Sequence, residues 1–135
     1  MRVVIDTNAL ISRLLLAQSV PARAVDRALS DMEIVVSEAA VGELADVLAR
    51  DKWDRYVTIE DRQEFIRRLL QIGTLVPVLS EIDDCPDPAD NHFLALALDA
   101  GAGLIITGDR DLLELHPWRN IRILTPAEFL RQFPD

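Results

Sequence analysis

The chain has few of the residues that would place a protein outside the cell or in a membrane. Cys85 is the only cysteine among 135 residues, so no disulfide can form within the chain, as is usual in a reducing compartment. No apolar run approaches the roughly 20 residues of a membrane-spanning helix. The first residues also lack the basic segment and long apolar run of a secretory signal. We therefore expect a cytoplasmic protein.

Basic residues are scarce as well, and nearly all are of one kind. Lysine occurs once, at Lys52, and the net charge is -9 at pH 7. This charge argues against broad electrostatic binding of nucleic acid, and it favours cation binding if the acids converge. The arginines suit bidentate contacts with phosphate or carboxylate, although the compositional habit of a GC-rich genome is the favoured explanation for them.

The composition, the length and the order of the apolar segments indicate one α/β domain. Half of the residues are apolar and 27% are charged, as in ordinary globular proteins, and the length suits a single domain over 1–135. Apolar runs of strand length alternate with helical patterns, which favours a mostly parallel sheet. Pro77 indicates that the third strand lies at a sheet edge. The expected strands are 2–5, 33–36, 75–79, 103–107 and 122–124, and the expected helices are 9–15, 22–30, 38–50, 60–72, 88–100 and a terminal one after 125, with a short helix or turn at 51–57.

Two of the expected strands lead directly into an aspartate. The first strand ends at Asp6, and the strand at 103–107 is followed by Asp109. If these strands are parallel, both carboxylates emerge at one edge of the sheet, where open α/β folds bind their ligands. Asp90 lies in the first turn of an apolar helix that leads into the 103–107 strand, so it faces the same edge. Glu43 lies about two turns into the helix after the second strand, among apolar neighbours.

Four carboxylates in one cleft repel one another unless a cation is present or some stay protonated. Mg²⁺ and Mn²⁺ prefer oxygen ligands, and such ions can activate water and stabilise charge on a phosphodiester. No competing nucleophile is visible, because His92 and His116 are isolated and Cys85 has no evident base. The sequence therefore predicts a divalent-metal site centred on Asp6.

Each acid also has a purely structural interpretation. Asp6 could cap the first helix, although Asn8 is the better-placed cap, and Asp109 could cap a short turn. Asp90 could serve a helix dipole, and Glu43 could be an ordinary helical glutamate. The joint placement of the four at one sheet edge is the stronger signal. Three further acids are expected to be loop and cap residues: Asp83, Asp84 and Asp87.

Four segments together resemble the PIN-domain ribonucleases. They are Val-Ile-Asp-Thr-Asn at 4–8, the glutamate at position 43, Asp-Asn-His-Phe-Leu-Ala-Leu-Ala at 90–97, and Ile-Ile-Thr-Gly-Asp-Arg-Asp-Leu at 105–112. They follow the family's order and span nearly the whole chain. The nearest group is the toxin components of bacterial and archaeal toxin–antitoxin pairs.

The resemblance implies a fold, an activity and partners. The fold is an α/β/α sandwich with a mostly parallel central sheet, and the activity is Mg²⁺- or Mn²⁺-dependent endonuclease cleavage of RNA. The implied partners are the RNA substrate, a small cognate antitoxin and a second copy of the chain in a homodimer. The resemblance implies that the catalytic metal ligands are Asp6, Glu43, Asp90 and Asp109, and that Asp111 is a further ligand found in part of the family. It also implies that Asn8 and Thr107 support the site. Our candidates for RNA contacts are Arg13 and Arg110, which lie nearest the motifs.

Two other interpretations stay open. A different metal-dependent phosphoryl-transfer domain, such as a haloacid-dehalogenase-like phosphatase, would need a second aspartate two residues after Asp6, where the chain has Asn8. Such domains and receiver domains also use a downstream lysine, and Lys52 lies in a helical segment instead. A catalytically inactive PIN-like module that binds protein is the other interpretation, and the presence of all four acids argues against it.

Overall fold

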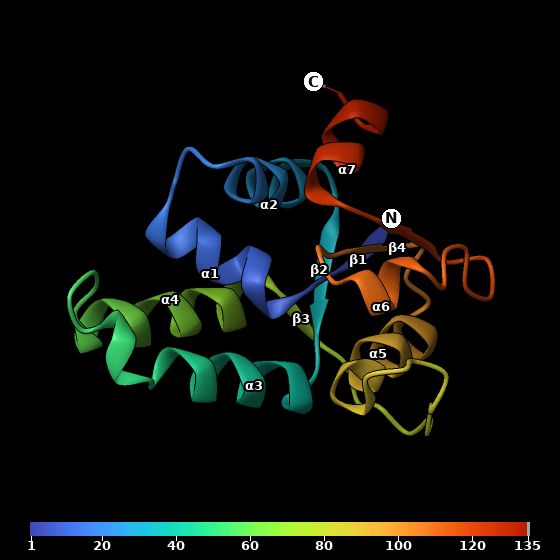
Figure 1. The fold of residues 1–135 in the computed structure, drawn as a ribbon, viewed down its shortest axis with the longest axis horizontal. Coiled ribbons are helices and arrows are strands. Elements are labelled where there is room, and N and C mark those ends of the chain that lie inside the picture. Colours follow the sequence, from blue (N-terminus) through green and yellow to red (C-terminus); the bar gives the residue numbers. More distant parts are fainter. Residues whose placement is uncertain (135) are drawn as a thin grey trace.

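A computed structural model describes residues 1–134 and shows a parallel sheet flanked by helices (Figure 1). No helix in this range is long and apolar enough to cross a membrane. The strands are β1 Arg2–Ile5, β2 Glu33–Val36, β3 Thr74–Leu75, β4 Leu104–Ile106 and β5 Arg122–Leu124; the helices are α1 Thr7–Leu15, α2 Val20–Asp31, α3 Glu38–Leu48, α4 Ile59–Ile72, α5 Asn91–Ala100, α6 Arg110–Leu113 and α7 Pro126–Gln132, with 3-10 turns η1 Asp51–Trp53 and η2 Pro88–Asp90.

The sheet has the strand order β3-β2-β1-β4-β5, and every neighbouring pair is parallel. The chain moves from β1 toward β2 on one side and returns to place β4 on the other side of β1. The strand order therefore reverses between β1 and β4, and open α/β sheets bind ligands at the carboxyl ends of the strands at such a point. The predicted α/β/α sandwich with a parallel sheet is confirmed.

The third strand lies at the sheet edge, as Pro77 predicts, but it is shorter than expected. Val76 still donates its N–H to the Val36 carbonyl (2.8 Å). Pro77 has no N–H to donate, and the chain from there has no regular secondary structure up to residue 84. The strand therefore covers Thr74–Leu75 instead of 75–79.

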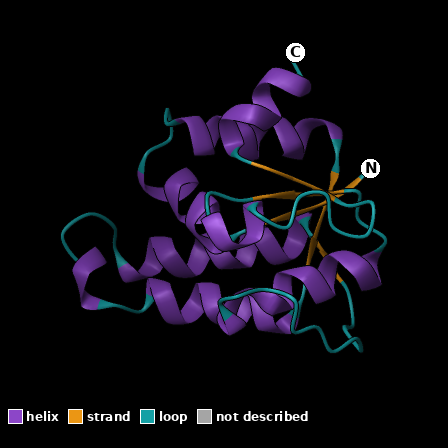
Figure 2. Ribbon diagram, turned by 45° about the vertical axis from the view of Figure 1, so that its right-hand side comes forward, coloured by secondary structure: helices purple, strands orange, loops and turns teal. Residues whose placement is uncertain are grey.

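Alternate strand residues feed two separate apolar cores, one on each face of the sheet. Val3 and Ile106 point into the core formed with α1, α2, α3, α4 and α7. Val4 and Ile105 point into the core formed with α5 and Leu112 of α6. This alternation is the period of two expected of strands that are covered on both faces. Figure 2 shows the strands, in orange, between these helices.

A buried arginine fixes the connection between α3 and α4. The Arg62 side chain is only 6% exposed, and its guanidinium donates to the carbonyls of Leu48 (2.9 Å) and Val57 (2.9 Å) and to the carboxylate of Asp54 (2.7 Å). A buried charge is stable only when it is paired and hydrogen-bonded in this way. The 51–57 turn, for which the sequence indicates a short helix or turn, is held to both helices by one side chain.

Candidate active site

Asp6 lies at the carboxyl end of β1 and caps α1. Its Oδ1 accepts a hydrogen bond from the Ala9 N–H (3.1 Å), and its Oδ2 accepts the hydroxyl of Thr107. The expectation that Asn8 caps this helix is wrong, because α1 already begins at Thr7 and the Asp6 carboxylate reaches the N–H three residues ahead. The side chain of Asn8 is thereby left exposed and free for another role.

Burial dominates the electrostatics of Asp6. The residue is only 5% exposed. Desolvation raises the pKa of Asp6 above its usual value, the hydrogen bonds from Thr107 and from backbone N–H groups oppose this rise, and the charge of Asp109 adds to it. A buried anion next to a second carboxylate is an arrangement that a cation would stabilise.

Thr107 links the ends of β1 and β4. It is fully buried, donates its hydroxyl to Asp6 and accepts the backbone N–H of Asp109 (3.0 Å). Asp109 in turn caps α6 by accepting the N–H of Asp111 (2.8 Å). The structural interpretations of Asp6 and Asp109 as caps are therefore both correct, and the same caps turn the two carboxylates toward one edge of the sheet.

Glu43 reaches this edge from α3. The hydroxyl of Thr7 donates to its Oε2, and the Nε2 atom of His92 on α5 lies 3.5 Å from its Oε1. The expectation that His92 is isolated is therefore wrong. Thr7 was not among the residues expected at the site, although its position directly after Asp6 was a usable signal. The contact between Glu43 and His92 joins helices 49 positions apart and leaves no mark in the sequence pattern.

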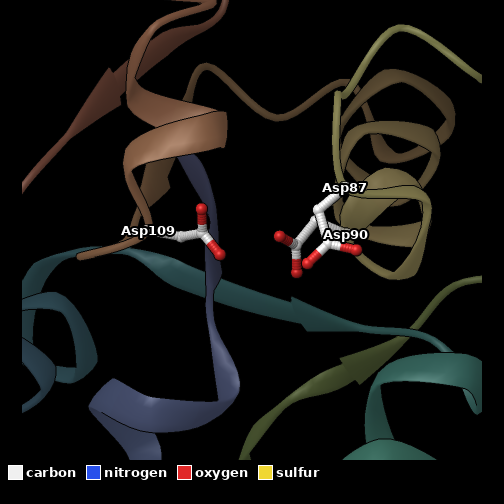
Figure 3. A group of neighbouring side chains, drawn as sticks. All are labelled: Asp87, Asp90 and Asp109. Carbon is white, nitrogen blue, oxygen red and sulfur yellow. The ribbon is translucent and has the colours of Figure 1, made fainter.

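Three carboxylates approach one another most closely. Among residues 1–134, one oxygen each from Asp87, Asp90 and Asp109 lie within 4.8 Å of one another. Figure 3 shows Asp109, from the turn after β4, facing Asp87 and Asp90 at the start of α5. Asp87 also accepts the N–H of Ala89 (3.0 Å), so it is the cap that the sequence predicts and a neighbour of the acids as well.

Asp90 has a buried carboxylate oxygen whose hydrogen-bonding capacity is not satisfied within the described part of the chain. Its Oδ2 atom is buried and has no hydrogen-bond partner among residues 1–134. Desolvation, the contact with the Asp109 carboxyl, and the charges of Asp109, Asp87 and Glu43 together raise the pKa of Asp90 to about 7. Buried polar atoms without partners are rare in folded proteins and often mark ligand sites. Carboxylate oxygens crowded in this way fit a hard divalent cation.

All four acids predicted to be catalytic line one cavity of about 190 Å³. Of the other predicted site residues, Asn8 also lines this cavity, whereas Asp111, Arg110 and Arg13 do not. Asp111 is half-buried on α6, and Arg110 is exposed at the start of that helix. Arg13 pairs with Asp26 of α2 (2.6 Å). The residues that line the cavity are Asp6, Thr7, Asn8, Glu43, Val47, Asp90, Phe93 and Asp109.

The fold and this acidic edge agree with a known family. The sequence model of the PIN domain family matches residues 2–111, and the chain belongs to that family. One curated relative is "Uncharacterized protein MJ1680" of Methanocaldococcus jannaschii, 26% identical over 142 aligned positions that cover 98% of this chain and 91% of the relative.

Two solved structures share the fold. VapBC2 of Rickettsia felis, bound to a DNA fragment from its promoter, superposes with a TM-score of 0.62 at 12% identity, covering 93% of this chain and 98% of that chain. PAE2754 of Pyrobaculum aerophilum superposes with a TM-score of 0.60 at 14% identity, covering 98% of this chain and 89% of that one. At these identities the likeness is one of fold.

Proposed function

We propose that this protein is a Mg²⁺- or Mn²⁺-dependent endoribonuclease. The observation that carries the proposal is the convergence of Asp6, Glu43, Asp90 and Asp109 on one small cavity at the point where the strand order reverses. The unpartnered Oδ2 of Asp90 supports it, because a divalent ion would supply the missing partner. Membership of the PIN domain family supports the nuclease class of activity.

The acids have separable roles in this proposal. Asp90 and Asp109, with Asp87 beside them, would hold the ion, which when bound supplies a positive charge that activates water and stabilises the phosphate. Asp6 and Glu43 complete the cavity and are held in place by the hydroxyls of the two threonines at positions 107 and 7. Burial and the neighbouring carboxylates raise the pKa of Asp90 to about 7 in the metal-free protein, and a bound cation would lower it again by favouring the charged carboxylate.

Cleavage assays test this proposal directly. We expect purified protein to cut RNA with Mg²⁺ or Mn²⁺ and to be inactive in EDTA. Asp6→Asn and Glu43→Gln should each lower the rate by roughly a hundredfold or more, since loss of even an outer-shell partner of a metal site costs about 10–100-fold. Asp46→Asn, an exposed acid on the same helix as Glu43, is the matched control and should keep full activity. Cleavage that persists in EDTA or in Asp6→Asn would refute the proposal.

We further propose that the protein is the toxin of a toxin–antitoxin pair and forms a homodimer. The likeness in fold to VapBC2 supports the first part. The chain should then copurify with a small protein encoded beside its gene, and that protein should inhibit cleavage. A mass of two chains in light scattering supports the dimer, and a single-chain mass at micromolar concentration refutes it.

A further inference from the structure

A second groove lies beside the acidic cavity, and Asp6 lines both. The groove has a volume of about 270 Å³ and shares Asp6, Asn8 and Asp109 with the cavity, so the two are adjacent. Its remaining walls come from α1, from the first turns of α2 and α7, and from the turn after β4. We call it the proline groove, after Pro21 and Pro126, which form two of its walls.

The proline groove combines apolar faces with unused hydrogen-bonding groups. Pro21 and Pro126 present apolar ring faces. Asn8 and Ser12 lie four positions apart on one side of α1, and within residues 1–134 neither side chain makes a hydrogen bond. The Asn8 amide is free because Asp6 caps the helix in its place.

The walls of the groove also exclude some ligands. Among residues 1–134, no arginine or lysine lines it, and Asp6 and Asp109 form part of its wall, so without a bound ion a phosphate group would be repelled there. A flat, uncharged ligand with a polar edge fits the apolar faces and the free amide and hydroxyl. The volume suits one base with its ribose, because pockets for whole drug-sized ligands begin near ~300 Å³.

We propose that the proline groove binds one nucleobase of the RNA next to the cleaved phosphate, with Asn8 and Ser12 contacting its polar edge. The proposal rests on the proposed ribonuclease function and adds to it a subsite that sets base preference. The base would pack against the two prolines, and the phosphate beside it would lie at the acids that the groove and the cavity share, where the positive charge of a bound ion would offset their repulsion.

Binding of free nucleosides tests the groove without cleavage or metal. Metal-free ¹⁵N-labelled protein is titrated with adenosine, guanosine, cytidine and uridine, which carry no phosphate. We expect at least one nucleoside to shift the backbone amide signals of Ala9, Ser12 and Gly108 with millimolar affinity. The absence of such shifts for all four nucleosides, or shifts confined to other surfaces, would overturn the proposal.

Two variants fill the groove by independent routes. Ser12→Leu adds bulk from α1, and Gly108→Ala adds a methyl group that meets no atom within 4 Å and needs no change of backbone conformation. We expect each to weaken nucleoside binding by about fivefold or more. Ser30→Leu, on an exposed part of α2, and Gly42→Ala, an equally open glycine on α3, are the matched controls and should bind normally. Equal binding in the filled and control variants would also overturn the proposal.

Cleavage of RNA with single abasic positions places the base relative to the cut. Removal of the base at one position beside the cut should lower kcat/KM by about tenfold in the natural protein, at the lower end of the effect of losing a stacked base. The same removal should have little effect in Ser12→Leu, while Mn²⁺ affinity, measured by electron paramagnetic resonance, stays unchanged. An undiminished abasic effect in Ser12→Leu would count against the groove. Complete lack of cleavage would refute the ribonuclease function instead, and the nucleoside titration would still decide the groove.

Discussion

Thr107 donates its hydroxyl to the carboxylate of Asp6, across 101 positions of sequence and across the boundary between β1 and β4. The same hydroxyl oxygen accepts the backbone N–H of Asp109. One side chain thus sets the positions of two acids that come from opposite ends of the chain. The bond also replaces part of the hydration that Asp6 loses on burial, which makes Thr107 a site where stability and activity should change together.

Replacing Thr107 with valine keeps the shape of the side chain and removes both hydrogen bonds. We expect a loss of about 1–3 kcal/mol in the free energy of unfolding, because a buried carboxylate and a backbone N–H each lose a partner. RNA cleavage should fall by at least about tenfold, since Asp6 and Asp109 lose their common support. Urea denaturation and initial rates measure the two effects. Thr107→Ser keeps the hydroxyl and should recover most of both; a valine variant as stable and active as the natural protein would contradict this role.

The raised pKa of Asp90 should make the metal-free protein less stable as the pH rises. Because the folded-state pKa, about 7, exceeds the unfolded value of roughly 4, the folded protein holds more protons between these limits. Its stability is therefore highest below about pH 4 with respect to this group, falls through the interval, and stays low above pH 7. Asp90→Asn should flatten this fall and raise the melting temperature at pH 8 by on the order of 3 °C, a small shift because solvent screens a partly exposed group.

Melting curves in EDTA from pH 4 to pH 8 measure this slope. Asp46→Asn, which removes an exposed acid outside the cavity, should leave the slope as it is. Two results would contradict the raised pKa of Asp90: a stability of the natural protein that rises between pH 5 and pH 7, and the same dependence of stability on pH in Asp90→Asn.

The strand ends and the four predicted acids could be located from the sequence because they depend on local rules. An apolar run that stops at Asp6 or at Thr107 marks the carboxyl edge of a parallel strand, and parallel strands bring such residues together. The sequence favoured Asn8 over Asp6 as the cap, and this ranking is wrong because Asp and Asn are nearly equal as caps and the pattern alone cannot choose between the two positions. The helix began at the earlier residue, directly after the strand.

Contacts between helices that are distant in the chain could not be predicted from the sequence in the same way. His92 touches Glu43 only because α5 packs against α3 on the same side of the cavity. Asp87 joins Asp90 and Asp109 because the 3-10 turn before α5 folds the cap back over the helix start. Neither arrangement follows from spacing or hydropathy. The proline groove likewise needs four segments in place before its walls exist.

The two histidines should respond to leucine substitution with opposite signs. Both ring nitrogens of His92 are buried without a hydrogen-bond partner in residues 1–134, so His92→Leu should leave the metal-free protein equally stable or stabilise it by up to about 1 kcal/mol. His116 accepts the backbone N–H of Ile123 at its Nδ1 (2.8 Å), so His116→Leu should cost about 1 kcal/mol. Urea denaturation of both variants in EDTA decides this, and a loss of stability in His92→Leu larger than that in His116→Leu would reverse the assignment.

The cleavage rates of the same two variants should differ as well, but here His92→Leu should be the more damaging change. His92→Leu removes the side chain that faces Glu43 at 3.5 Å and should lower the cleavage rate by about tenfold. His116→Leu lies outside the cavity and should retain the rate. A His92→Leu variant with full activity would show that Glu43 does not depend on this neighbour.

Arg62 should contribute far more to stability than the arginines exposed on the same helix. Arg62→Met leaves the Leu48 and Val57 carbonyls and Asp54 without their donor and should cost about 3 kcal/mol. Arg67→Met removes an arginine whose side chain is 64% exposed and which pairs with Glu64, so it should cost less than about 1 kcal/mol. Chemical denaturation measures both, and equal losses would contradict the special position of Arg62.

The order of the strands has a consequence for the time at which the acidic cavity is assembled during synthesis of the chain. β1 is made first, but its partner β4 and the aspartate at position 109 follow about a hundred residues later. Until β4 has emerged from the ribosome and paired with β1, Asp6 lacks its threonine partner and the cavity lacks one wall. Pairing between strands so far apart in sequence is also a late event in folding. A growing chain, or a fragment that ends before β4, therefore lacks the assembled cavity, and under the proposed ribonuclease function the messenger RNA on the translating ribosome would meet only active chains that have been almost completely made.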